Sequence, residues 1–277
     1  MSVPTPAWLE IRRGSAPLVI SLPHTGTEIP DEFRAGLVSL WRARKDCDWW
    51  IEKLYDFAVE LDATVIRTTI SRTIIDVNRD PSGVSLYPGQ ATTELCPTTT
   101  FDGEPLYLSG QEPDAAEIER RKQIYFAPYH AAIGAELARL KKSHPHVALY
   151  DCHSIRSAIP RLFDGELPHF NIGTNSGASC APELQRQIAV ICDDTIFSSV
   201  SNGRFKGGFI TRNFGAPQQG IHAVQMELAC RGYMPERPGP VSEADWPSAY
   251  DAAYAAPMRE ALRTILQACL DFARSAA

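Results

Sequence analysis

The chain has 277 residues, of which 44% are hydrophobic and 22% are charged, and its formal net charge is −6. An acidic chain without a basic block is not typical of nucleic-acid-binding proteins, and its longest apolar runs are too short to cross a bilayer. Because the N-terminus also lacks the order of a signal peptide, we expect a soluble, cytoplasmic protein with no nucleic-acid or membrane partner.

Apolar runs typical of strands alternate with stretches of helical periodicity. "PLVISLP" predicts a first buried strand, and Trp50, Leu54 and Phe57 lie on one face of a predicted helix. A long helix is expected to start near Asp114 and to be interrupted near Pro128. In chain order, we expect strands at 17–23, 63–69, 72–77, 146–151, 170–174, 207–211 and 221–228, and helices at 46–61, 112–143, 182–192 and 247–274.

This alternation favours an α/β fold, with residues 1–277 as a single domain around a central mixed, largely parallel sheet flanked by helices. Residues 80–112 are rich in Pro, Gly and Thr. We interpret them as a long surface excursion near the active site, because such excursions in compact proteins are often functional. The seven cysteines are widely spaced without a CxxC pair, so we expect small core residues rather than disulfides or a structural zinc site. The sequence predicts no oligomeric state.

Two histidines directly follow apolar runs, His24 after 17–23 and His153 after 146–151. Each is therefore expected at the carboxyl end of a strand, where open α/β sheets bind their ligands. Two imidazoles at one sheet edge can share a catalytic metal, which needs a third protein ligand. Asp151 lies two residues before His153, on the same face of the strand, and can reach the site or brace a ligand.

Several carboxylates compete for the place of the third ligand. Glu28 follows His24 by four residues, and "KDCDWW" offers Asp46 and Asp48 ahead of a predicted helix. Two histidines and one carboxylate form a known hydrolytic zinc set. The residues alone leave the choice open.

Nucleophilic catalysis by Cys152 or Ser154 is the alternative for "YDCHSIRS". Neighbouring residues on a strand point in opposite directions, so neither side chain is well placed to bond His153. The sequence also has no GxSxG motif. The metal interpretation is therefore preferred.

Polar and charged groups near predicted strand ends indicate recognition of a small anion. Asn78 and Arg79 end "SRTIIDVNRDP", which is either a simple turn or an anion-binding segment, since Arg offers a bidentate fork to carboxylates. Further cations near strand ends are Arg72, Arg156 and Arg212.

Glu227 lies late in the apolar run "IHAVQMEL". Burial tends to raise the pKa of a carboxylate, which suits a general acid or base. A paired structural glutamate is the alternative.

Seven stretches, in order from about residue 17 to 234, resemble the N-formylglutamate deformylase (N-formylglutamate amidohydrolase) family. They are "SLPHTGTEIP", "DCDWWIEKLYDFA", "SRTIIDVNRDPSG", "YDCHSIRS", "FNIGTNSG", "GGFITRNFG" and "GIHAVQMELACRGYM". That family is similar to zinc carboxypeptidases and to the succinylglutamate desuccinylase and aspartoacylase group. The resemblance implies a zinc-carboxypeptidase-like fold with one Zn²⁺ ion, although another divalent metal can occupy such a site.

The resemblance assigns roles to particular residues. It implies that His24 and His153 are metal ligands and that Asn78 and Arg79 bind substrate. It also implies that Glu227 is the general base. The related HxxE pattern is one residue shorter than the spacing from His24 to Glu28, so Asp48 is the preferred third ligand, with Asp46 and Glu28 as competitors.

The implied activity is zinc-dependent hydrolysis of N-formyl-L-glutamate to L-glutamate and formate, the last step of a histidine degradation route. Arg79 is expected to stabilise the oxyanion, and Arg72, Arg79, Arg156 and Arg212 are candidates to bind the substrate carboxylates. One alternative is an amidase or carboxypeptidase-like hydrolase for another N-acyl acidic amino acid. Another is a metal-free dicarboxylate-binding protein.

Overall fold

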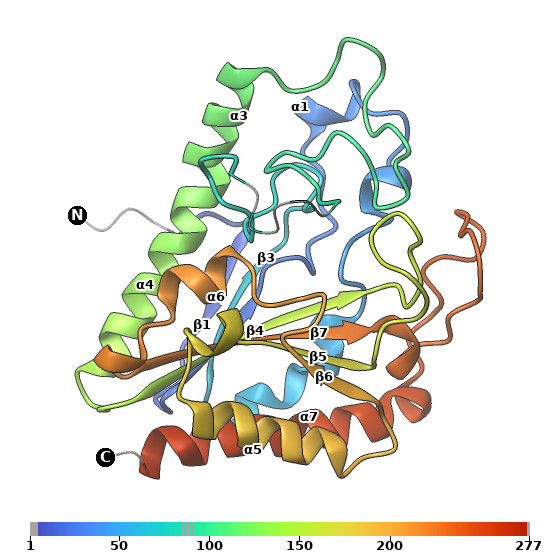
Figure 1. The fold of residues 1–277 in the computed structure, drawn as a ribbon. Helices are drawn as coiled ribbons and strands as arrows, with labels where there is room; N and C mark the ends of the chain where they lie inside the picture. Colours follow the sequence, from blue (N-terminus) through green and yellow to red (C-terminus); the bar gives the residue numbers. More distant parts are fainter. Residues whose placement is uncertain (1–4, 85, 87–88, 90, 276–277) are drawn as a thin grey trace.

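A mixed β-sheet lies at the centre of the protein in the computed structural model, which describes residues 5–84, 86, 89 and 91–275 (Figure 1). Its strand order is β1-β3-β2-β4-β7-β5-β6. Strands β3, β2, β4 and β7 are parallel, while β1 and β5 join antiparallel to β3 and β7. The expected α/β fold with a mixed, largely parallel sheet is confirmed. The strands are β1 Leu9–Arg12, β2 Leu18–Leu22, β3 Thr64–Thr68, β4 Val147–Ile155, β5 Phe170–Gly173, β6 Ser199–Ser201 and β7 Ile221–Ala229.

Helices cover both faces of this sheet (Figure 1). Helices α5 and α7 pack on one face, and α4 packs on the other together with residues of α3 and α6. The helices are α1 Asp31–Arg34, α2 Ile51–Leu54, α3 Ala115–Arg121, α4 Ala127–Lys141, α5 Pro182–Asp193, α6 Phe209–Phe214 and α7 Ala252–Ser275.

Successive side chains of β4 point to opposite faces of the sheet, so they pack alternately into the hydrophobic cores on the two faces. Val147 and Leu149 pack with the α4 side, whereas Tyr150 and Cys152 pack with α5 and α7. By the same alternation, His153 points to the α4 side. Every residue of β4 is buried, so the polar groups in its carboxyl half need partners inside the protein.

The long helix expected over 112–143 is confirmed, including its interruption. The Asp114 side chain caps α3 by accepting a 2.8 Å hydrogen bond from the backbone N–H of Glu117. A π-helical turn, Lys122–Phe126, separates α3 from α4. Pro128, the second residue of α4, cannot donate a backbone hydrogen bond, and the widened turn before it accommodates it.

The helix expected over 46–61 is wrong in extent. Trp50 adopts a left-handed φ of 65°, so α2 covers only Ile51–Leu54 and a 3₁₀ segment, Asp56–Leu61, follows it. The two short segments bury Leu54 and Phe57 in the core, and Trp50, just before them, is partly buried against it. The break leaves Asp48 in a loop, where its backbone N–H donates to the carbonyl of His24 at 2.9 Å.

Two expected strands, 72–77 and 207–211, are wrong. Residues 72–77 form a turn, in which the backbone N–H of Ile74 donates to the carbonyl of Ser71 at 2.9 Å. Residues 207–208 precede helix α6, and residues 209–211 form its first half. The apolar residues of both segments are buried against the α4 side of the core, so their β-branched character reflects packing rather than strand pairing.

Smaller differences concern the element ends. Strand β4 continues to Ile155, past the expected end at residue 151, and α7 begins at Ala252 rather than at 247. The short strands β1 and β6 at the sheet edges were not expected.

All seven cysteines are free and buried within the described chain, as expected. Among the described residues, none of the helices is both long and apolar enough to cross a membrane.

Candidate metal and catalytic site

Three donor atoms converge near the carboxyl ends of β2 and β4. His24 follows β2, Asp48 lies in the loop before α2, and His153 is on β4. The Nδ1 atom of His153 lies 3.1 Å from Nδ1 of His24 and 3.2 Å from Oδ2 of Asp48. The remaining separation, from Nδ1 of His24 to Oδ2 of Asp48, is 3.7 Å. The three buried side chains form a cluster that can hold a metal ion.

Each imidazole is braced at its other nitrogen by a separate buried carboxylate. His24 donates from Nε2 to Asp76 Oδ1 at 2.7 Å, and His153 donates from Nε2 to Asp151 Oδ2 at 2.9 Å. Such a bond fixes the tautomer and orientation of a metal-binding histidine. Both Nδ1 atoms are therefore available as ligand atoms within the cluster.

The donor set fits a small cation. Two imidazole lone pairs and a carboxylate oxygen at these separations repel one another unless a proton or a cation lies among them. Ligand atoms about 2.0–2.1 Å from a tetrahedral zinc ion are separated by roughly 3.3 Å, which is close to the spacing of these three donors. The other carboxylate oxygen, Asp48 Oδ1, is buried and accepts no hydrogen bond from the described residues.

The two imidazoles differ in their electrostatic surroundings. Burial and the Arg72 guanidinium lower the pKa of His24, outweighing the effect of Asp76. Burial also tends to lower the pKa of His153. The carboxylates of Asp151 and Asp48 outweigh burial and raise the pKa of His153 well above its ordinary value. The surroundings of His153 therefore favour the protonated imidazole, whereas those of His24 favour the neutral one.

Glu227 lies beside the cluster on β7, in register with His153 on β4. Its side chain is buried, and it accepts a 3.3 Å hydrogen bond from Nε2 of Gln225. Burial raises the pKa of Glu227 to about 7. A carboxylate with this pKa can take up and release a proton near neutral pH.

Cys152 and Ser154 point away from this cluster. Cys152 belongs to the core on the α5 and α7 side. The Ser154 hydroxyl accepts a 2.8 Å hydrogen bond from the Tyr233 hydroxyl. The structure thus has the alternation expected along this strand, which directs Cys152 and Ser154 away from the face of His153.

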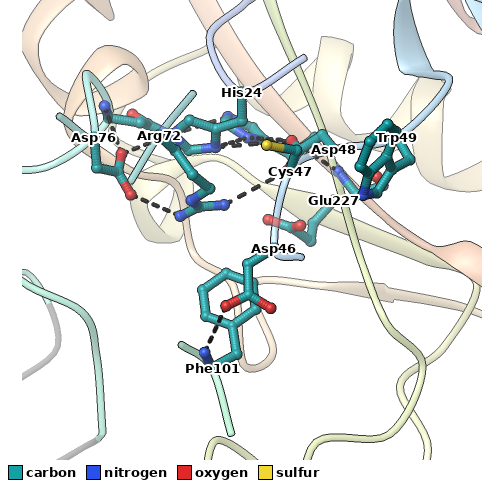
Figure 2. Close-up of polar contacts among 12 residues, drawn as sticks. His24, Asp46, Cys47, Asp48, Trp49, Arg72, Asp76, Phe101 and Glu227 are labelled. Carbon is teal, nitrogen blue, oxygen red and sulfur yellow. Dashed lines mark hydrogen bonds and ion pairs between the residues drawn. The ribbon is translucent and has the colours of Figure 1, made fainter. Parts of the chain in front are cut away.

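The competing carboxylates lie elsewhere. Asp46 points toward the 100–102 segment, where it accepts a 2.6 Å hydrogen bond from the backbone N–H of Phe101 (Figure 2). Glu28 accepts a 2.7 Å hydrogen bond from the Thr69 hydroxyl. Of the three candidates for the third ligand, Asp48 is the one that the structure brings to both histidines.

The Asn78 side chain contacts His153 and the carboxylate of Asp151 that braces it. Its Nδ2 lies 2.9 Å from His153 Nε2 and donates to Asp151 Oδ2 at 3.2 Å. Its Oδ1 accepts a 2.8 Å hydrogen bond from the backbone N–H of Ile210 in α6. A side chain at Gly208 would place Cβ only 2.4–2.6 Å from the amide atoms of Asn78, so glycine permits this close approach.

A cavity opens beside the donor cluster. Phe101, Ile155, Leu162 and Phe205 form its apolar part. The segment expected as an excursion, 80–112, contributes part of the wall. The other lining residues are His24, Arg72, Asn78, Arg79, Ala91, Thr92, Thr93, His153, Arg204, Gly208, Gln225 and Glu227.

Two of the expected arginines line this cavity. Arg72 donates from Nη2 to Asp76 Oδ2 at 2.6 Å, and its guanidinium lies 4.8 Å from the centroid of the Phe101 ring. Arg79 donates from Nε to the carbonyl of Thr93 at 3.1 Å and from Nη2 to the Thr93 hydroxyl at 3.2 Å. Both cations are therefore held in place next to the donor cluster.

The other two expected arginines are not among the described residues that line the cavity. Arg156 donates from Nη2 to Asp102 Oδ2 at 2.6 Å and lines a separate surface pocket. Arg212 donates from Nε to the carbonyl of Gly207 at 2.9 Å.

Sequence reasoning missed three residues of the site. Asp76 lies within the stretch "SRTIIDVNRDP", two residues before Asn78. Gln225 shares a strand face with Glu227, so the period of two on β7 could have identified it. Arg204 lines the cavity from the loop after β6, and no local pattern pointed to it.

Known sequences are similar to this chain over most of its length. The sequence model of the N-formylglutamate amidohydrolase family matches residues 16–234. An N-formylglutamate deformylase of Pseudomonas aeruginosa is 46% identical over 96% of this chain and 97% of its own length. A protein of the same name from Pseudomonas putida is 45% identical over 95% of both chains.

Solved structures share the fold at low sequence identity. An N-formylglutamate amidohydrolase from Ralstonia eutropha JMP134 superposes with a TM-score of 0.79 at 22% identity, covering 98% of this chain and 100% of the other. A gene product of Agrobacterium tumefaciens gives a TM-score of 0.70 at 15% identity and 95% coverage of both chains. From the family match and the close relatives, the chain belongs to the N-formylglutamate amidohydrolase family.

Proposed function

We propose that this chain hydrolyses N-formyl-L-glutamate to L-glutamate and formate and that it needs a metal ion to do so. One observation carries the proposal: the donor atoms of His24, Asp48 and His153 converge next to Glu227 at a cavity lined by arginines. The names of the two Pseudomonas relatives support the choice of substrate.

The metal is proposed to be a single zinc ion held by His24, Asp48 and His153. Imidazole and carboxylate donors suit zinc, although other divalent ions accept the same donors. When bound in such a site, zinc lowers the pKa of a water molecule and polarises a carbonyl group.

Glu227 is proposed to move the proton. As a carboxylate, it takes the proton of the water that attacks the formyl carbon, and it then delivers this proton to the leaving nitrogen. Its pKa of about 7 suits both steps, since the group must accept and release a proton in one turnover. Gln225, which donates to Glu227 at 3.3 Å, orients the carboxylate.

The arginines that line the cavity are proposed to bind the anionic substrate. N-formylglutamate carries two carboxylates, and guanidinium groups pair with carboxylates in a bidentate manner. Arg72, Arg79 and Arg204 supply these cations, and Arg79 also stabilises the negative charge on the formyl oxygen. Arg156 and Arg212 lie outside the lining, so we assign them no direct contact with the substrate.

The cellular setting is part of the same proposal. The family resemblance supports a reaction at the end of a histidine degradation route. We further propose that the chain acts in the cytoplasm and that residues 1–277 form one amidohydrolase domain.

A formate-release assay tests the proposed substrate. The purified, zinc-loaded protein is incubated with N-formyl-, N-acetyl- and N-succinyl-L-glutamate at equal concentration. Formate from the first substrate, with the other two hydrolysed at least about 100-fold more slowly, is the expected result. Faster release of acetate or succinate would instead support an amidase for another N-acyl acidic amino acid. Binding of glutamate without hydrolysis of any substrate would support a dicarboxylate-binding protein.

A further inference from the structure

Asp76 is a buried carboxylate that contacts both parts of the site. Its Oδ1 accepts hydrogen bonds from His24 Nε2 at 2.7 Å and from the backbone N–H of Asn78 at 2.9 Å. Its Oδ2 lies 2.6 Å from Nη2 of Arg72 and 3.7 Å from Nε of Arg79. One oxygen therefore faces His24, and the other faces the guanidinium of Arg72 (Figure 2). The guanidinium of Arg79 lies near the same oxygen as that of Arg72, and both arginines line the cavity.

This arrangement differs from that of the second bracing carboxylate. Asp151 is equally buried and holds His153 at 2.9 Å. Its other described partner is the side-chain amide of Asn78, at 3.2 Å. No ion pair between Asp151 and an arginine occurs among the described residues. The two carboxylates thus brace equivalent histidines, but of the two only Asp76 also contacts the arginines. Arg72 has a second, longer ion pair with Asp48 Oδ1 at 3.5 Å.

We infer that Asp76 is a positioning residue that sets both the metal ligand His24 and the Arg72–Arg79 pair, so that one side chain supports metal binding and anion binding. The inference rests on the proposed function for the identity of the anion. Its physical basis is the rigidity of the carboxylate: the two oxygens are a fixed distance apart, so a shift that keeps one set of contacts strains the other. The burial of Asp76 at 0% exposure adds to this, because water cannot replace a lost partner.

The test compares Asp76→Asn with Asp151→Asn as the matched control. Zinc affinity is measured by competition with a chelator, and L-glutamate affinity is measured by calorimetry on the metal-free protein. Both variants should lose zinc affinity by about 10- to 100-fold, the usual effect of removing a partner of a metal ligand. Only Asp76→Asn should also lose at least about tenfold in L-glutamate affinity, because it alone releases the arginine pair. Asp151→Asn should stay within about twofold of the wild type in that measurement.

Three results would overturn the inference. One is an Asp76→Asn protein that binds L-glutamate as the wild type does, which reduces Asp76 to a brace for His24. The second is unchanged zinc affinity in that variant. The third is a metal-free wild type that binds no L-glutamate, because Asp76 could then have no role in anion binding.

Two controls keep the test decisive. If Asp76→Asn does not fold by circular dichroism, Asp76→Glu takes its place. The longer side chain cannot keep both the 2.6 Å and the 2.7 Å contacts, so at least one affinity must fall, and two unchanged affinities would refute the inference. Formate release by the wild type is recorded in parallel. Its absence would contradict the proposed function, while the two affinities would still decide the role of Asp76.

Discussion

His153 and Glu227 occupy paired positions on the adjacent parallel strands β4 and β7. Because paired residues on neighbouring strands project to the same face, the sheet itself brings the His153 imidazole, our proposed metal ligand, next to the Glu227 carboxylate, our proposed proton-transfer group. Both groups lie on rigid, buried strands rather than on loops. The relative position of these two side chains is therefore fixed by backbone pairing.

Replacing Glu227 by Gln should lower kcat for formate release by about 100- to 10,000-fold, because the variant lacks the proton acceptor while keeping the side-chain shape. Bound metal, measured by elemental analysis of the same protein, should remain at the wild-type level. A variant with nearly full kcat would remove Glu227 from the mechanism.

Replacing His153 by Ala should deplete the purified protein of metal. The loss of a direct ligand should exceed the 10- to 100-fold drop in affinity typical of outer partners. His144→Ala is the control, since His144 bonds the backbone carbonyl of Ser15 far from the cluster. Full metal content in the His153→Ala protein would show that the ion binds elsewhere.

The pH dependence of kcat/KM should show an acidic limb near pH 7. Burial raises the pKa of Glu227 from 4.5 to about 7, and only the deprotonated carboxylate can accept a proton. Activity should therefore fall about tenfold for each pH unit below 7. A rate that stays flat down to pH 5 would contradict this role, and the residual activity of Glu227→Gln should lack the limb.

Gly208→Ala should reduce kcat/KM by about 100-fold, since displacement of a site by about 1 Å has effects of this size. The added Cβ would push against the Asn78 amide, which contacts His153. Gly134→Ala in α4 is the matched control, because its Cβ would meet only an ordinary 3.7 Å contact with Phe214. Equal activity of the two variants would show that the Asn78 contact does not matter.

The sequence predicted where the strand-borne side chains of the candidate site lie. His24, His153 and Glu227 follow or lie in apolar runs, and a strand's period of two determines the face on which each side chain lies. The same period separated Cys152 and Ser154 from His153. These residues could be located because strand geometry is local.

The loop-borne part could not be derived in the same way. Asp48 reaches the histidines because Trp50 breaks the expected helix with a φ of 65°, a conformation that a tryptophan rarely adopts. Asp76 lies in a buried turn whose isoleucines gave the pattern of a strand. In both places tertiary packing overrides local preference, and the site carboxylates depend on that packing.

The most direct test of the central claim is a metal titration of activity. Metal-free protein is prepared with a chelator, zinc is added stepwise, and formate release from N-formyl-L-glutamate is measured at each step. We predict that the metal-free protein is inactive and that activity rises linearly to a plateau at one zinc ion per chain. Full activity of the metal-free protein would contradict the account.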